Sequence, residues 1–114
     1  MDNEKPNIAE WLSVLEKASR SQHYPALFKK VQKMLAVPSR KREAINLYKL
    51  NKHTKANDNV IVPRKILSIG KMDHKINVSA LELSEGARRA LTGSGCKIVN
   101  IKDMVNEKHI NVII

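Results

Sequence analysis

The residues with the clearest chemical signature are bases gathered in residues 37–55, VPSRKREAINLYKLNKHTK. This stretch contains six Lys or Arg and a single Glu. Arg can bind two phosphate oxygens at once and Lys acts as a point charge, so such a cluster favours binding to a polyanion. An ordinary solvated surface is the alternative interpretation. The six bases are Arg40, Lys41, Arg42, Lys49, Lys52 and Lys55.

The distribution of charge along the chain supports the binding interpretation. The formal net charge is +10; residues 1–28 have three bases and four acids, and residues 76–114 have five and four. Residues 29–75 have thirteen bases and three acids, which is a net charge of +10. A field concentrated in this way attracts nucleic acid, the commonest polyanion that basic intracellular domains meet. An anionic membrane surface is the rival, but it usually requires an apolar face or a lipid anchor.

Polar and aromatic side chains alternate with the bases of this segment. Asn46, Tyr48, Asn51 and His53 could hydrogen-bond to sugar or stack on a loop base, although each alone is also an ordinary surface or core residue. We include Asn46 and His53 in the predicted RNA-binding set.

A second group of bases is predicted next to a buried strand. The run Val60–Val62 favours a strand that Pro63 ends, so Arg64 and Lys65 are expected on the loop at its exit. Lys71 lies at the next turn and extends the predicted basic surface. An ordinary loop at the end of a strand is the alternative interpretation.

Catalytic and metal-binding chemistry is poorly supported. The segment 92–95, TGSG, follows a predicted helix and lacks the spacing of a phosphate loop, so we interpret it as the turn that ends a helix. The four His residues show no metal-ligand spacing, and Cys96, the sole cysteine, is expected in the core. We therefore expect no enzyme activity, no cofactor, no metal and no small-molecule substrate.

Two amphipathic helices are predicted in residues 1–38. Asn7 can cap the first helix, with Glu10 three residues later. Pro25 can begin the second, and Pro38 is expected to end it. The apolar positions follow helical spacing, and they are Ile8, Trp11, Leu12, Leu15, Ala18, Leu27, Phe28, Val31 and Leu35. These helices are expected to form a hairpin.

Strands and helices alternate after residue 38, which predicts an α/β fold. Residues 45–47 favour a short strand, and a helical turn over 48–54 would place Lys49, Lys52 and Lys55 on one side. The apolar residues Ile45, Leu47 and Leu50, which lie among these bases, are expected to anchor the segment to the core. The segment 75–83 favours a strand covered on one face. A helix from Ser84 to about residue 91, a strand at 97–101, a short helix at 102–107 and a strand at 110–114 complete the prediction.

The chain is interpreted as one domain, 1–114. Residues 1–38 form its N-terminal helices, 39–75 its basic segment and 76–114 the rest of the core. No run of about eighteen apolar residues occurs, and the N-terminus is acidic and polar, so we expect a cytoplasmic protein without membrane contact. The concentrated charge works against self-association, so no homo-oligomer is expected.

These residues resemble a known family. The order of motifs is RKR at 40–42, INLYKLN at 45–51, VIVP at 60–63 with KIL at 65–67, NVSA at 77–80 and Ser84-x-x-Ala87. This pattern is similar to the eighteen-e family of archaeal and eukaryotic large-subunit ribosomal proteins, which are related to bacterial large-subunit protein fifteen. The resemblance covers nearly the whole chain and fits the short archaeal form. Arg64, Ser68 and Cys96 stand where the family usually has glycine.

The resemblance implies a structural constituent of the large ribosomal subunit with no catalysis and no cofactor. It implies large-subunit rRNA and neighbouring ribosomal proteins as partners, and an irregular ββα superhelical core behind N-terminal helices. Two rival functions stay open. One is a free-standing RNA- or DNA-binding protein, and the other is a protein adaptor that uses Trp11 and the helical hairpin.

Overall fold

The computed structural model describes residues 7–21, 25–36 and 43–113. Its N-terminal part is a pair of packed helices, α1 (Ile8–Ser21) and α2 (Pro25–Leu35). Asn7 begins α1, because its Oδ1 atom accepts a hydrogen bond of 3.1 Å from the backbone N–H of Glu10. The predicted helical hairpin is therefore confirmed, whereas the predicted stop at Pro38 lies outside the described residues.

A five-stranded parallel sheet follows the hairpin, which confirms the α/β class. The strands are β1 (Ile45–Asn46), β2 (Asn59–Leu67), β3 (Asn77–Leu83), β4 (Lys97–Ile98) and β5 (Asn111–Val112). The order is β1-β2-β3-β4, and β5 also pairs with β2. Ile45 pairs with Ile66 near the end of β2, whereas Asn111 pairs with Val60 near its beginning. Two segments far apart in the sequence therefore flank the same long strand.

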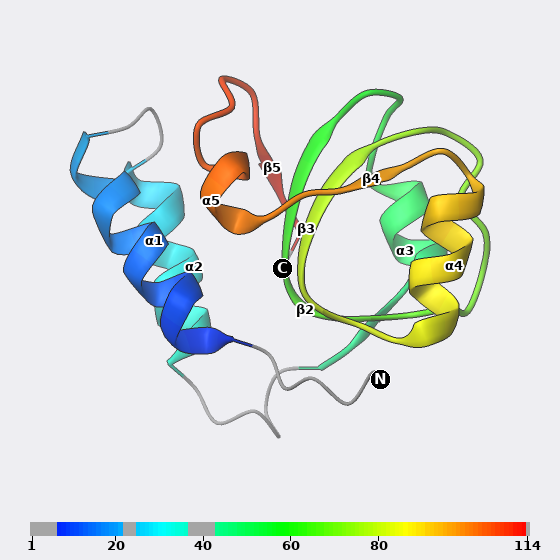
Figure 1. The fold of residues 1–114 in the computed structure, drawn as a ribbon, viewed down its shortest axis with the longest axis horizontal. Helices are drawn as coiled ribbons and strands as arrows, with labels where there is room; N and C mark the ends of the chain where they lie inside the picture. The colour runs from blue at the N-terminus through cyan, green and yellow to red at the C-terminus, as the bar shows by residue number, and fades with distance from the viewer. Residues whose placement is uncertain (1–6, 22–24, 37–42, 114) are drawn as a thin grey trace.

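Both faces of the sheet are covered. One core lies between the sheet and the helices α1, α2 and α5 (Ile101–Met104), and it includes Trp11, Leu15, Phe28, Ile61 and Leu81. The other lies on the side of α3 (Leu47–Lys52) and α4 (Glu85–Gly93), and it includes Leu47, Leu50, Val60, Val78 and Leu91. Figure 1 shows these two groups of helices on opposite sides of β2 and β3.

This arrangement corrects the expectation that residues 75–83 are covered on one face. Val78 belongs to one core and Leu81 to the other, and Ser79 is also buried, with its Oγ donating to the carbonyl of Val99 at 2.6 Å. Alternation along the strand does occur, but helices cover both surfaces, as they do in most parallel sheets.

The C-terminal elements follow the predicted order with different lengths. Ser84 caps α4, since its Oγ accepts a hydrogen bond of 3.1 Å from the N–H of Ala87. The predicted turn after α4 is confirmed, and Gly95 adopts a φ of +83° there. The predicted strands at 97–101 and 110–114 are shorter, being Lys97–Ile98 and Asn111–Val112.

The strand β2 runs through Pro63, so the prediction that Pro63 ends it is wrong. Val62 pairs with Ala80 and Lys65 with Glu82, which leaves one extra residue on β2 between these pairs. Proline is tolerated in such a bulge because the extra residue needs no N–H for pairing, and the bulge also changes the direction of the neighbouring side chain, here Arg64. Arg64 and Lys65 therefore lie within the strand rather than on a loop. Neither Arg64 nor Ser68 has a positive φ, so the absence of glycine causes no backbone strain there.

No helix in the described residues has the length and apolar character needed to cross a bilayer.

Candidate nucleic-acid interface

The short helix α3 carries the best-placed bases because its other side is anchored in the core. Leu47 and Leu50 are fully buried, and Ile45, two residues before the helix, is nearly so. Lys49 and Lys52 are exposed on the opposite side. The apolar residues inside this basic stretch thus hold its cations in defined positions, which lowers the ordering cost of binding.

A groove of about 400 Å³ lies beside α3. We call it the α3 groove, and it is lined by Glu43, Ala44, Ile45, Asn46, Tyr48, Lys49, Lys52, His53 and Arg64. Five of the predicted site residues line this groove. Four of them lie in residues 46–53, and the fifth, Arg64, comes from the strand β2. Among the described residues that line the groove, Glu43 is the sole acid, so these residues carry a surplus of positive charge, which is the electrostatic requirement for a polyanion.

Arg64 reaches the groove because of the bulge in β2. Its Nη1 atom donates a hydrogen bond of 2.7 Å to the backbone carbonyl of Glu43, two residues before β1. Its Nε atom is buried and has no acceptor among the residues that the structure describes. The guanidinium is thus held against the groove wall and retains a donor that is not satisfied.

A second hollow, of about 390 Å³, continues from the first. It is lined by Lys49, His53, Asn111, Val112 and Ile113, so Lys49 and His53 belong to both. Asn111 was not predicted as a site residue. It reaches this surface because β5 pairs with the beginning of β2, and its Nδ2 atom donates to Asp58 at 3.1 Å. No local sequence signal marks a pairing across about fifty residues.

Three predicted bases do not join the α3 groove. Because α3 ends at Lys52, Lys55 lies beyond the helix and does not share a face with Lys49 and Lys52. Lys65 faces Glu82 on the adjacent strand, with Nζ and Oε2 3.8 Å apart, so part of its charge is neutralised. Lys71 is exposed on the connection between β2 and β3 and lines neither hollow. Arg40, Lys41 and Arg42 lie outside the described residues.

A hydrogen-bonded chain fixes the end of α3 to the loop before β3. The Oγ1 atom of Thr54 donates to the carbonyl of Leu50 at 2.9 Å and lies 2.7 Å from Nε2 of His74. Nδ1 of His74 lies 2.8 Å from the Asp73 carboxylate. The order hydroxyl, imidazole, carboxylate matches that of a hydrolase triad. Here, however, Thr54 is buried and its hydroxyl contacts a backbone carbonyl, so the chain acts as a structural clamp.

This clamp predicts a specific acid dependence of stability. Hydrogen bonds from His74 and then Asn51 lower the pKa of Asp73 below its ordinary value of 3.8. A lowered folded-state pKa means that the carboxylate stabilises the protein above 3.8, and that this contribution disappears as the pH falls through the folded-state pKa. We expect wild type to be more stable than Asp73→Asn near neutral pH, with the difference shrinking below about pH 4. Urea unfolding of both proteins from about pH 3 to 7 measures the difference in their free energies of unfolding. A difference that is independent of pH would contradict the role of the carboxylate.

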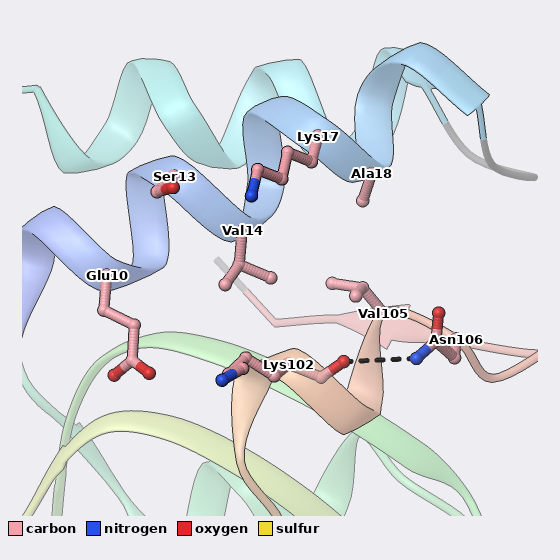
Figure 2. A pocket seen from close by; sticks show the side chains of 8 residues that line it. All are labelled: Glu10, Ser13, Val14, Lys17, Ala18, Lys102, Val105 and Asn106. Atoms are coloured by element: carbon pink, nitrogen blue, oxygen red, sulfur yellow. Dashed lines mark hydrogen bonds between the residues drawn. The ribbon is translucent and has the colours of Figure 1, made fainter.

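A third hollow, of about 440 Å³, lies away from α3, between α1 and α5. Figure 2 shows Val14 of α1 and Val105, which follows α5, between the two helices. Glu10, Lys17 and Lys102 also line it, so its charges are of mixed sign and its floor is partly apolar. This hollow fits a polyanion less well than the α3 groove does.

No group of three His, Cys, Asp or Glu side chains that would suit a metal ion occurs within the described ranges. The fold and the surface around α3 define a small basic α/β protein with an ordered cationic surface. Sequence comparison identifies the family. The chain is 42% identical over 87 residues to the large ribosomal subunit protein eL18 of Sulfurisphaera tokodaii, covering 76% of this chain and 74% of the relative.

A second relative matches over nearly the whole length. The eL18 protein of Methanothermobacter thermautotrophicus is 35% identical over 112 residues, covering 95% of this chain and 92% of the relative. No model of a protein family matches the chain. The two relatives show that the chain belongs to the eL18 family of large ribosomal subunit proteins, which confirms the resemblance seen in its motifs.

Proposed function

We propose that this protein is a structural constituent of the large ribosomal subunit and binds large-subunit rRNA through the folded surface around α3. The relatives named as large ribosomal subunit proteins carry this proposal, because they match up to 95% of the chain. The α3 groove supports it, since Lys49, Lys52 and Arg64 lie on one surface of suitable charge. Neighbouring ribosomal proteins are the expected protein partners, the ribosome in the cytoplasm is the expected location, and no catalytic step is proposed.

The binding is expected to follow the backbone and shape of folded RNA more than its sequence. Lys and Arg contacts to phosphate fix position and register, and the deep major groove of duplex RNA gives side chains little access to bases. The α3 groove and the hollow beside it are therefore proposed as one continuous contact surface. Lys55, Lys65 and Lys71 remain proposed as peripheral contacts.

Sedimentation tests the ribosomal role directly. A tagged copy of the protein is followed through a sucrose gradient of native lysate, before and after a high-salt wash. Co-sedimentation with large subunits that survives moderate salt is expected. A peak at the top of the gradient, or one removed by mild salt, would instead indicate a free-standing RNA- or DNA-binding protein.

The triplet Arg40, Lys41 and Arg42 is proposed as a further phosphate-binding group on the strength of its sequence alone. Replacing all three with Gln is expected to weaken rRNA binding and to flatten its salt dependence by about one log-log unit for each phosphate that the variant no longer neutralises. Titration with an rRNA fragment at several salt concentrations measures the slope. An unchanged slope would remove the triplet from the interface.

A further inference from the structure

Tyr48 is the feature of the α3 groove that phosphate binding alone does not require. The residue is 62% exposed, although its neighbours Leu47 and Leu50 are fully buried. Among the described residues, the other large aromatic side chains, Trp11 and Phe28, are both buried in the core. The ring therefore adds little to packing, and it lies in the groove wall with the bases.

The backbone of Tyr48 is held in place by contacts with Ile69 and Gly70. Its N–H donates a hydrogen bond of 3.0 Å to the carbonyl of Ile69. Gly70 packs directly on it, since a Cβ atom added to Gly70 would lie 2.6 Å from the Tyr48 nitrogen. An exposed ring on such a fixed backbone loses little freedom when a ligand stacks on it.

The groups around Tyr48 are those that a nucleotide requires. Lys49 and Lys52 supply cations for phosphate, and Asn46 and His53 supply donors and acceptors for a base edge or a sugar hydroxyl. The side chain of Asn46 does not cap α3, although the residue occupies the N-cap position. Arg64 adds a third cationic side chain to the same wall. The volume of about 400 Å³ falls in the range of about 300–1,000 Å³ typical of small-ligand pockets.

We propose that the α3 groove binds one unstacked nucleotide of the RNA, with its base on the ring of Tyr48 and its flanking phosphates on Lys49 and Lys52. This inference rests on the proposed function and deepens it. A base within a continuous duplex has both faces covered by its neighbours, so a tyrosine ring can stack only on a base that is bulged, looped or terminal. The ligand is thus a folded RNA with an unpaired nucleotide. Every base has a flat aromatic face, so the stacking contact accepts any of the four bases.

Two RNA hairpins with the same paired stem, sealed at both ends by non-nucleotide linkers so that no loop or terminal base is exposed, provide the test. One is fully paired, and the other contains a single bulged 2-aminopurine, whose fluorescence is quenched by stacking. The proteins are wild type, Tyr48→Ala, Tyr48→Phe and Ile69→Ala. Ile69 is 61% exposed beside Tyr48, so its replacement removes exposed apolar surface without removing the ring.

The expected result is a selective loss of affinity. Tyr48→Ala should weaken binding of the bulged hairpin by about 5- to 150-fold and abolish the quenching, because stacking on one base contributes that much. Binding of the paired hairpin should stay unchanged. Tyr48→Phe and Ile69→Ala should both behave as wild type, since each keeps an aromatic ring at position 48.

Other outcomes would overturn the inference in distinguishable ways. Equal binding of both hairpins by wild type and Tyr48→Ala would leave the phosphate contacts in place but exclude a base site. Failure of Tyr48→Ala to associate with large subunits, with RNA binding intact, would mean that a protein covers the ring. If wild type bound neither hairpin nor large subunits, the proposed function would fail as well.

Discussion

Replacing Lys49, Lys52 and Arg64 with Gln is expected to reduce the affinity for large-subunit rRNA by about 500-fold at about 0.1 M salt. Each phosphate contact to duplex contributes about 0.9 to the slope of log K against log salt, so three contacts contribute about 2.7. The difference should vanish as the salt concentration approaches about 1 M. These three side chains line one groove, so they can act on one ligand together. Titration of an rRNA fragment at several salt concentrations measures both the affinity and the slope.

A matched control distinguishes the effect of losing the groove cations from the effect of lowering the net charge. Replacing Arg88, Arg89 and Lys97 with Gln removes the same charge from exposed positions on α4 and β4. We expect this control to change the slope much less than the groove variant does. Equal effects from the two variants would show that RNA responds to overall charge and would remove the α3 groove from the proposal. Thermal unfolding of both variants confirms that each remains folded.

Replacing Gly70 with Ala is expected to destabilise the protein by about 2–5 kcal/mol. Gly70 has a φ of +103°, a conformation that residues with a side chain rarely adopt. The added Cβ would also lie between 2.6 and 2.8 Å from the N, Cβ and Cα atoms of Tyr48. The clash is largely with backbone, so it cannot be relieved by rotating a side chain. Urea unfolding measures the reduction in stability.

Gly93 provides the comparison for this substitution. It is the last residue of α4, and a Cβ added there would meet nothing within 4 Å. Gly93→Ala is therefore expected to leave stability unchanged or to raise it by up to about 1 kcal/mol, since alanine favours helix. If Gly70→Ala were as stable as Gly93→Ala, the loop after β2 would not hold α3 as the structure indicates. Any surviving Gly70→Ala protein should also bind the bulged RNA hairpin less well, because Tyr48 must shift.

Elements that depend on local signals could be predicted from the amino-acid sequence. The hairpin of α1 and α2 follows from helical spacing of apolar residues, and Trp11, Phe28 and Val31 are buried as that spacing predicts. Ser84 caps α4 because its hydroxyl reaches an N–H three residues away. The burial of Leu47 and Leu50 beneath a basic surface also follows from sequence. The pattern that predicts each of these features lies in residues within about one helical turn of each other.

The assembly of the site, in contrast, depends on contacts between distant segments. Arg64 enters the α3 groove because a bulge at Pro63 turns it toward Glu43, which lies 21 residues earlier. The second hollow exists because β5 pairs with β2 across about fifty residues. Lys65 lies outside the groove, and its charge is partly neutralised because Glu82 lies opposite. Parallel strands are paired by packing on both faces of the sheet, and no local pattern specifies which segments become neighbours. The composition of the chain therefore indicated a basic binding surface, and the pairing of distant strands selected the side chains that form it.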